Sequence, residues 1–164
     1  MSEIQFVPIR NSDESFLWEM LYQALYVPAG QAAFSRNILS QPDIACYVQG
    51  WGRIGDWGLL ACDGETPVGA VWLRQWSGTE NGYGYVDETV PEMSIALLPD
   101  YRGSGLGSRM IKEIIRIARK SYPAISLSVV ESSPARHLYE RFGFQTVGRV
   151  GGSLVMLLRL IDDK

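Results

Sequence analysis

The stretch MSIALLPDYRGSGLGSRMIKEIIRIARK, residues 93–120, decides the fold because it contains three structural signals in a fixed order. Apolar residues alternate in Met93–Leu98, which predicts a strand, and Pro99 ends it because proline cannot donate to a β-ladder. A glycine-rich turn, Arg102–Gly107, follows. After the turn, apolar side chains recur at helical spacing with charged residues opposite them, which predicts an amphipathic helix ending near Lys120.

The glycine-rich turn has the properties of an anion-binding site. The first N–H groups of a helix have no intrahelical acceptor, and the helix dipole places partial positive charge at the same end. Glycines let a bulky anion approach the backbone, and Arg102 adds a positive charge beside them. We therefore expect the turn to bind phosphate or pyrophosphate. The alternative is a tight strand-to-helix turn that binds nothing.

The spacing of the glycines excludes two common nucleotide-binding loops. Gly103, Gly105 and Gly107 form Gly-x-Gly-x-Gly, whereas dinucleotide-binding loops have Gly-x-Gly-x-x-Gly. No Lys-Ser or Lys-Thr pair follows Gly107, so the turn is not a Walker A loop. A nucleotide-binding α/β domain is therefore disfavoured.

The turn instead resembles the Arg/Gln-x-x-Gly-x-Gly/Ala signature of the GNAT family of N-acetyltransferases, with Arg102, Gly105 and Gly107 at the fixed positions. In that family the loop wraps the pyrophosphate of acetyl-CoA, so the resemblance implies acetyl-CoA as co-substrate. The cofactor-binding residues that it implies in this turn are Arg102, Gly103, Ser104, Gly105, Leu106, Gly107 and Ser108.

A second segment, Ser132–Phe144, resembles a later signature of the same family, Asn-x-x-Ala-x-x-Leu-Tyr-x-x-x-Gly-Phe. The order and separation of the two signatures are those of the family. Ser132 occupies the Asn position and is the cofactor-binding candidate there, with a shorter side chain and a single donor. The matching residues are Ala135, Leu138, Tyr139, Gly143 and Phe144.

The composition fits one globular domain over residues 1–164. With 46% hydrophobic and 20% charged residues the chain is ordinary for a soluble protein, and a net charge of −3 argues against a nucleic-acid partner. No signal peptide or apolar run of about 18 residues is visible, so we expect a cytoplasmic protein without a membrane partner. A single histidine and two unpaired-looking cysteines, Cys46 and Cys62, predict no metal site.

The rest of the chain predicts a mixed sheet with helices on both faces, an α/β (α+β) fold. The Asp63-Gly64-Glu65 turn predicts a hairpin, and the strand–helix–strand unit that ends at Val130 should be parallel and right-handed. In residues 44–55, Tyr47, Trp51 and Ile54 could lie on another helical turn, but glycines at 50, 52 and 55 disfavour it. Strands are expected at 3–10, 56–62, 66–77, 93–98, 124–130, 144–150 and 153–160, and helices at 16–25, 31–39, 106–120 and 134–142.

The order of these elements resembles the acyl-CoA N-acyltransferase fold, whose sheet is mostly antiparallel. In that fold the strand before the glycine turn and the strand after its helix diverge around the pantetheine arm of the cofactor. The resemblance implies direct attack of a primary amine, of a small molecule or a peptide, on the thioester in a ternary complex. It also implies that a backbone N–H near Leu97 or Leu98 polarises the thioester carbonyl.

Tyr139 matches the general acid of the family, which protonates the departing thiolate. A protonated amine also needs a base. Glu92, which begins the strand before the glycine turn, is the first candidate for this base, and Asp87 and Glu88 in the preceding loop are alternatives.

The resemblance places residues 22–34 and 78–85 against the thioester. Tyr26, Phe34, Tyr83 and Tyr85 are therefore the substrate-binding candidates, although aromatic residues most often belong to the core. The alternative function is an acyl-CoA-binding regulatory module without turnover, which the glycine turn would serve equally well. Tyr139 and Glu92 favour the enzyme. The sequence fits a monomer or a homodimer and does not name the amine.

Overall fold

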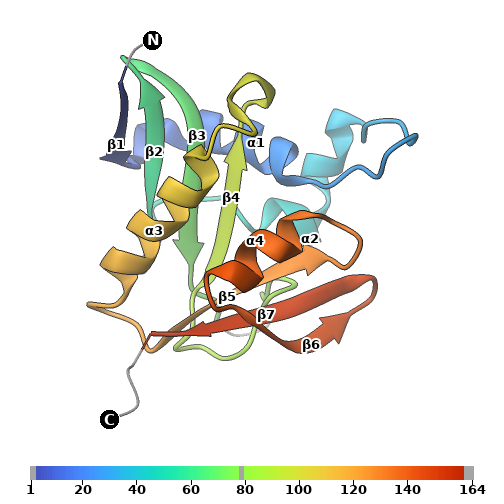
Figure 1. The fold of residues 1–164 in the computed structure, drawn as a ribbon. Helices are drawn as coiled ribbons and strands as arrows, with labels where there is room; N and C mark the ends of the chain where they lie inside the picture. The colour runs from blue at the N-terminus through green and yellow to red at the C-terminus, as the bar shows by residue number, and fades with distance from the viewer. Residues whose placement is uncertain (1–2, 78–79, 161–164) are drawn as a thin grey trace.

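A seven-stranded mixed sheet runs through the computed structural model, which describes residues 3–77 and 80–160, in the order β1-β2-β3-β4-β5-β7-β6 (Figure 1). Neighbouring strands are antiparallel except β4 and β5, which are parallel. The mixed, mostly antiparallel sheet expected from the sequence is thus confirmed. The strands are β1 Ile4–Pro8, β2 Trp57–Asp63, β3 Thr66–Arg74, β4 Glu92–Leu97, β5 Ala124–Val130, β6 Gln145–Val150 and β7 Ser153–Arg159.

Helices cover both faces of this sheet, as expected. The helices α3 and α4 pack on one face, and α1 and α2 pack on the other (Figure 1). The α-helices are α1 Glu14–Ala24, α2 Pro42–Ala45, α3 Leu106–Ala118 and α4 Ala135–Arg141, and the 3-10 helices are Asn11–Asp13, Arg36–Ser40 and Pro99–Tyr101.

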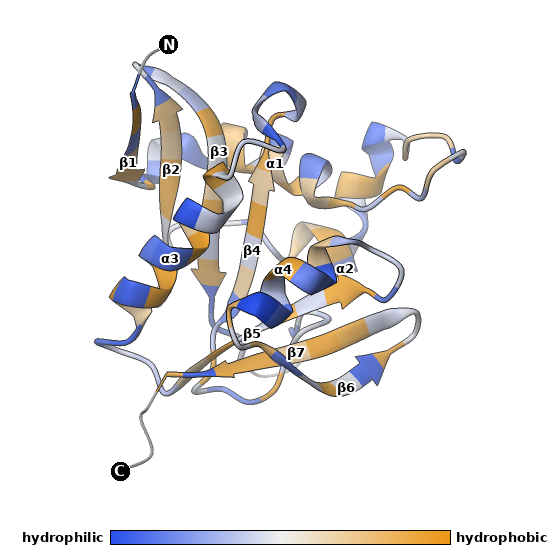
Figure 2. Cartoon of the chain, in the orientation of Figure 1, coloured by the Kyte–Doolittle hydropathy of each residue, from blue (hydrophilic) through white to orange (hydrophobic). Residues whose placement is uncertain are grey.

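The alternating residues of β4 face opposite sides of the sheet, and the apolar stripe of α3 is buried, as predicted. Met93, Ile95 and Leu97 of β4 face the α3 side, whereas Ala96 belongs to the core under α1. The buried stripe of α3 faces the sheet and its hydrophilic stripe faces outward (Figure 2). Each fully buried aliphatic side chain of this stripe contributes about 1.5–3 kcal/mol of transfer free energy.

The prediction of a helix over residues 31–39 is wrong in extent. A left-handed turn at Gly30, with φ of 84°, precedes residues 31–35, which have no helical structure. The 3-10 helix Arg36–Ser40 then begins where the Ser35 hydroxyl accepts a hydrogen bond from Asn37 N. In the unassigned region 44–55, α2 ends at Ala45 and turns follow.

The parallel strands β4 and β5 diverge almost as soon as they meet. Their register contains the single pair Glu92 and Ser126 in the described chain, with Ser126 N donating to Pro91 O at 3.0 Å. Beyond this point β4 stays paired to β3, and β5 stays paired to β7 along its whole length from Ala124 to Val130. The sheet therefore opens between β4 and β5, as the resemblance implied.

Candidate active site

The opening between β4 and β5 contains a cavity of about 340 Å³. Residues 92–95 of β4 and 127–130 of β5 form its sheet side. The C-terminal end of α1 and the segment after it form a second wall, and α4 contributes a third. Of the sequence-predicted site residues, this cavity brings together Glu92, Tyr139, Tyr26, Phe34 and Tyr83.

Glu92 is a buried carboxylate at the sheet side of the cavity, and its side chain is held by protein donors. The residue is 2% exposed. Its Oε2 accepts a 2.6 Å hydrogen bond from the Tyr47 hydroxyl, and its Oε1 accepts 3.0 Å bonds from Trp76 Nε1 and Gly84 N. Burial raises the pKa of Glu92 to about 7, and these hydrogen bonds oppose that rise. A carboxyl with such a pKa can exchange protons at neutral pH.

The described part of the 78–85 loop closes directly over Glu92, and residues 78–79 lie outside the described residues. A Cβ at Gly82 would lie 2.4 Å from Glu92 Oε1, and one at Gly84 would lie 2.8 Å from its Cδ. Tyr83 N donates to the Tyr47 hydroxyl at 2.7 Å. These glycines are needed because the loop backbone passes close to the carboxylate.

Tyr139 lies on α4 and contributes to the opposite side of the cavity. Its ring makes an edge contact with Phe144, with centroids 6.0 Å apart. Burial raises the pKa of Tyr139 to about 12, so the hydroxyl keeps its proton at neutral pH. A protonated phenol at a cavity wall can act as a proton donor.

The glycine turn offers free backbone donors. Gly103 and Gly105 have φ of 74° and 82°, and a Cβ at either position would meet nothing within 4 Å. No acceptor for the N–H groups of residues 103–108 is found in the part of the chain that the structure describes. Open space, left-handed glycines and unpaired N–H groups at the start of α3 fit an anionic phosphate group.

Arg102 is exposed at this turn, but protein acceptors hold its guanidinium. Its Nη2 donates to the side-chain Oε1 of Gln23 at 2.9 Å and to the Gln23 carbonyl at 3.3 Å, and its Nε lies 3.3 Å from Leu97 O. The guanidinium thus links the glycine turn, β4 and the end of α1.

Comparisons with known proteins decide the family. Residues 18–144 match the family model of the acetyltransferase (GNAT) family. The chain belongs to the GNAT family. It is 42% identical over 55 residues to [ribosomal protein bS18]-alanine N-acetyltransferase of Haemophilus influenzae, covering 33% of this chain and 38% of that protein.

Another GNAT relative, the mycothiol acetyltransferase of Brachybacterium faecium, is 29% identical over 93 residues, which is 56% of this chain and 27% of the relative. The matches thus span well under half the length of these curated relatives. The structure of the PaiA N-acetyltransferase from Thermoplasma acidophilum in complex with coenzyme A aligns with a TM-score of 0.68 at 16% identity, over 96% of this chain and 99% of that one. This alignment shows the same fold.

The GNAT resemblance left Leu97 and Leu98 as alternatives for the N–H that polarises the thioester carbonyl. The directions of their backbone N–H groups distinguish the two. Leu98 N donates to Val68 O at 2.9 Å, so it faces β3. Because strand N–H groups alternate in direction, the N–H of Leu97 faces the opening toward β5. Leu97 is therefore the better placed of the two.

Ser132 and Tyr85, like Leu97, Leu98 and the glycine turn, lie outside the cavity lining. Ser132 is exposed, whereas its neighbour Ser133 is 7% exposed and lines the cavity, with its Oγ accepting from Ala135 N at 3.3 Å. Tyr85 packs against the core under α1 instead of lining the cavity. Of these candidates, the geometry favours the unpredicted Ser133.

The alternative bases Asp87 and Glu88 are exposed and do not line the cavity. Asp87 accepts hydrogen bonds from the hydroxyl and the N–H of Thr89, and these bonds lower its pKa. Sequence reasoning missed Tyr47 and Trp76, the side chains that hold Glu92. Tyr47 lies in the region 44–55, where the helical spacing was weakened by glycines and no role was assigned.

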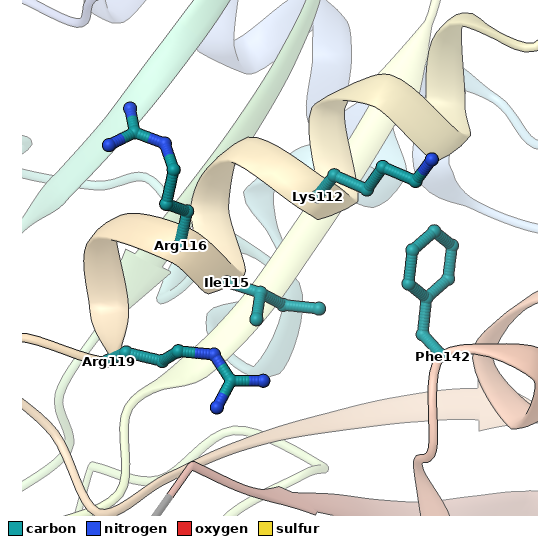
Figure 3. A pocket seen from close by; sticks show the side chains of 5 residues that line it. All are labelled: Lys112, Ile115, Arg116, Arg119 and Phe142. Atoms are coloured by element: carbon teal, nitrogen blue, oxygen red, sulfur yellow. The ribbon is translucent and has the colours of Figure 1, made fainter.

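A second hollow, of about 250 Å³, lies between the outer side of α3 and Phe142 (Figure 3). Its charged lining residues are Lys112, Arg116 and Arg119. Arg116 is paired with Glu113, and Arg119 Nη1 donates to Leu160 O. None of the candidate acid, base or substrate residues lines this hollow, so the larger cavity is the candidate active site.

The described residues also bear on two other kinds of site. No group of three or more His, Cys, Asp or Glu side chains that could hold a metal ion is found among them. Within the same residues, no helix is both long enough and apolar enough to cross a membrane.

Proposed function

We propose that this GNAT protein transfers an acetyl group from acetyl-CoA to a primary amine by direct attack in a ternary complex. The observation that carries the proposal is the cavity between the diverging strands β4 and β5. A buried carboxyl, Glu92, and a protonated phenol, Tyr139, lie on separate walls of this cavity. The glycine turn with free N–H groups follows β4 directly.

The residues present fit the cofactor that the family implies. The free N–H groups of residues 103–108 would hold the pyrophosphate, and the opening between β4 and β5 would hold the pantetheine arm. When bound, acetyl-CoA supplies the thioester whose acetyl group is transferred. The Leu97 N–H would donate to the carbonyl oxygen as negative charge develops there.

Glu92 takes a proton from the substrate ammonium. An alkylammonium with a pKa near ~10.4 is almost fully protonated at neutral pH, so a base is required. Burial raises the pKa of Glu92 to about 7, which makes the carboxylate a stronger base than an exposed glutamate while leaving it substantially ionised. Proton transfer occurs directly or through a water molecule.

Tyr139 gives a proton to the departing thiolate. The C–N bond to the acetyl carbon forms and the C–S bond breaks, so the nitrogen loses two protons overall. Glu92 takes the first of these protons before the amine attacks. Tyr139 gives its own proton to the sulfur, and the second proton from the nitrogen replaces it. A partly buried phenol that is protonated at neutral pH suits this role.

The test is release of free CoA thiol when the full chain is mixed with acetyl-CoA and a panel of amines. The panel covers aliphatic and aromatic monoamines, polyamines, aminoglycosides, amino acids and N-terminal peptides. Amine-dependent release that Glu92→Gln reduces supports the proposal. Binding of acetyl-CoA without release on any amine would contradict it and support an acyl-CoA-binding module.

A further inference from the structure

The acceptor side of the cavity is lined mainly by aliphatic and aromatic side chains. Because the opening between β4 and β5 receives the cofactor arm, the acceptor must approach from the wall built by α1 and the segments after it. The larger side chains of that wall include Leu21, Leu25, Tyr26, Phe34, Ile38 and Ile44. Among the described residues that line the whole cavity, Glu92 alone carries an ionisable acidic or basic group that charges near neutral pH.

Glu92 cannot serve as an additional anchor for a multiply charged substrate. Its carboxylate oxygens already accept hydrogen bonds from Tyr47, Trp76 and Gly84, and it lies at the sheet side where the reacting nitrogen must come. One carboxylate can balance one ammonium. A second ammonium on the substrate would have no negative partner in the cavity. A carboxylate on the substrate would have no positive partner there.

Two charged residues on the segments that form this wall already have partners. Arg36 pairs with Glu19 and lies over the Tyr22 ring, 4.0 Å from its centroid. Asp43 accepts a hydrogen bond from the Tyr83 hydroxyl. Neither Arg36 nor Asp43 lines the cavity, so neither supplies the missing counter-charge.

We propose that the acceptor is a primary monoamine with an apolar aliphatic or aromatic body and no second charged group. This inference rests on the proposed acetyl transfer and names its substrate class. The ammonium end meets Glu92, and the body packs against the wall of Tyr26, Phe34 and Ile38. Burial of apolar surface against that wall supplies the binding free energy.

Matched pairs of amines test the substrate class. Hexylamine and hexamethylenediamine share one carbon chain and differ by one ammonium, and phenethylamine and phenylalanine differ by one carboxylate. We expect kcat/KM to be about 100-fold higher for the monoamine of each pair, because the site leaves the added charge unpaired.

The outcomes separate this inference from the proposed function. Turnover confined to polyamines, amino acids, aminoglycosides or peptides would overturn the inference and leave acetyl transfer standing. Equal use of both members of each pair would overturn it as well. Absence of CoA release with every amine would overturn both.

A variant of the wall gives a second, independent readout. Phe34 is 42% exposed, and the Tyr22 hydroxyl holds its backbone carbonyl, so a polar side chain fits there without loss of the core. Phe34→Glu adds a carboxylate and should raise the ratio of kcat/KM for hexamethylenediamine over hexylamine about tenfold. Ile54→Glu adds the same charge at a fully exposed position and should leave the ratio unchanged. An unchanged ratio in folded Phe34→Glu would overturn the placement of the acceptor.

Discussion

The Tyr47 hydroxyl donates a 2.6 Å hydrogen bond to Oε2 of Glu92, a residue 45 positions away in the sequence. The same hydroxyl accepts a 2.7 Å hydrogen bond from Tyr83 N. One phenol thus connects the candidate base to the loop that lies over it. Tyr47 therefore both orients the carboxylate and stabilises its ionised form.

Replacing Tyr47 by Phe should shift the pH profile of the enzyme. The hydrogen bond from Tyr47 lowers the pKa of Glu92, so its loss should move the acidic limb of kcat/KM to higher pH. At neutral pH we expect kcat/KM to fall about tenfold. The profile is measured by CoA release across the pH range.

The matched control for Tyr47→Phe is Tyr85→Phe, because Tyr85 does not line the cavity. The acidic limb of the kcat/KM profile of this control should lie at the same pH as in the wild type. If Tyr47→Phe lowers the rate equally at every pH, then Tyr47 acts only on the shape of the site and its electrostatic role is wrong.

The buried Glu92 should also make folding stability depend on pH. Its pKa is raised in the folded protein from an ordinary 4.5 to about 7 by burial. The folded state therefore binds more protons than the unfolded chain between these values. The contribution is complete below pH ~4.5 and is lost as pH rises through about 7.

Comparison with Glu92→Gln isolates the contribution of Glu92 to the pH dependence of stability from that of other titrating groups. Across that pH window the free energy of unfolding of the wild type should fall by about 3 kcal/mol relative to the variant. Urea unfolding at a series of pH values measures the difference. Parallel curves for the two proteins would show that Glu92 titrates normally.

The fold was predictable because its signals are local. Alternation gave the bounds of β5 without error, and the glycine spacing after β4 marked the start of α3. The support of Glu92 was not predictable. Tyr47 lies in a turn-rich region where glycines weaken the helical spacing, and its contact with Glu92 joins distant parts of the chain through tertiary packing. Ser133 was missed because the family motif aligns its neighbour.

Tyr139→Phe should separate chemistry from binding. The variant removes the proton donor and keeps the ring that packs on Phe144. We expect kcat to fall about 100-fold, with little change in the affinity for acetyl-CoA or in the melting temperature. Steady-state kinetics and calorimetric titration of CoA test the two parts. Wild-type turnover would remove Tyr139 as the acid.

The buried pair of Arg74 and Asp56 should stabilise the segment that carries Tyr47. Arg74 is 1% exposed and donates to both Asp56 oxygens and to the carbonyls of Cys46 and Gln49. Asp56→Ala leaves the guanidinium buried without its counter-charge, which should cost about 3–5 kcal/mol of unfolding free energy.

Urea unfolding of an exposed pair provides the contrast to Asp56→Ala. Glu80→Ala breaks the solvent-exposed ion pair with Arg53 and should cost at most about 1 kcal/mol. Similar losses in the two variants would show that burial of the Arg74 pair has no special effect.

Gly105→Ala should weaken cofactor binding through the backbone alone. Gly105 has φ of 82°, and a Cβ there would meet no atom within 4 Å, so the cost comes from the left-handed conformation and not from a clash. Relaxation of the turn would change the direction of the free N–H groups of residues 103–108 and should raise the KM for acetyl-CoA about tenfold.

Gly151→Ala is the control for Gly105→Ala. Gly151 also has a positive φ, 58°, and open space around it, but it lies in the β6–β7 turn. Both variants should lose about 1 kcal/mol of stability, and only Gly105→Ala should change the KM for acetyl-CoA. An unchanged KM in Gly105→Ala would show that the pyrophosphate does not bind at this turn.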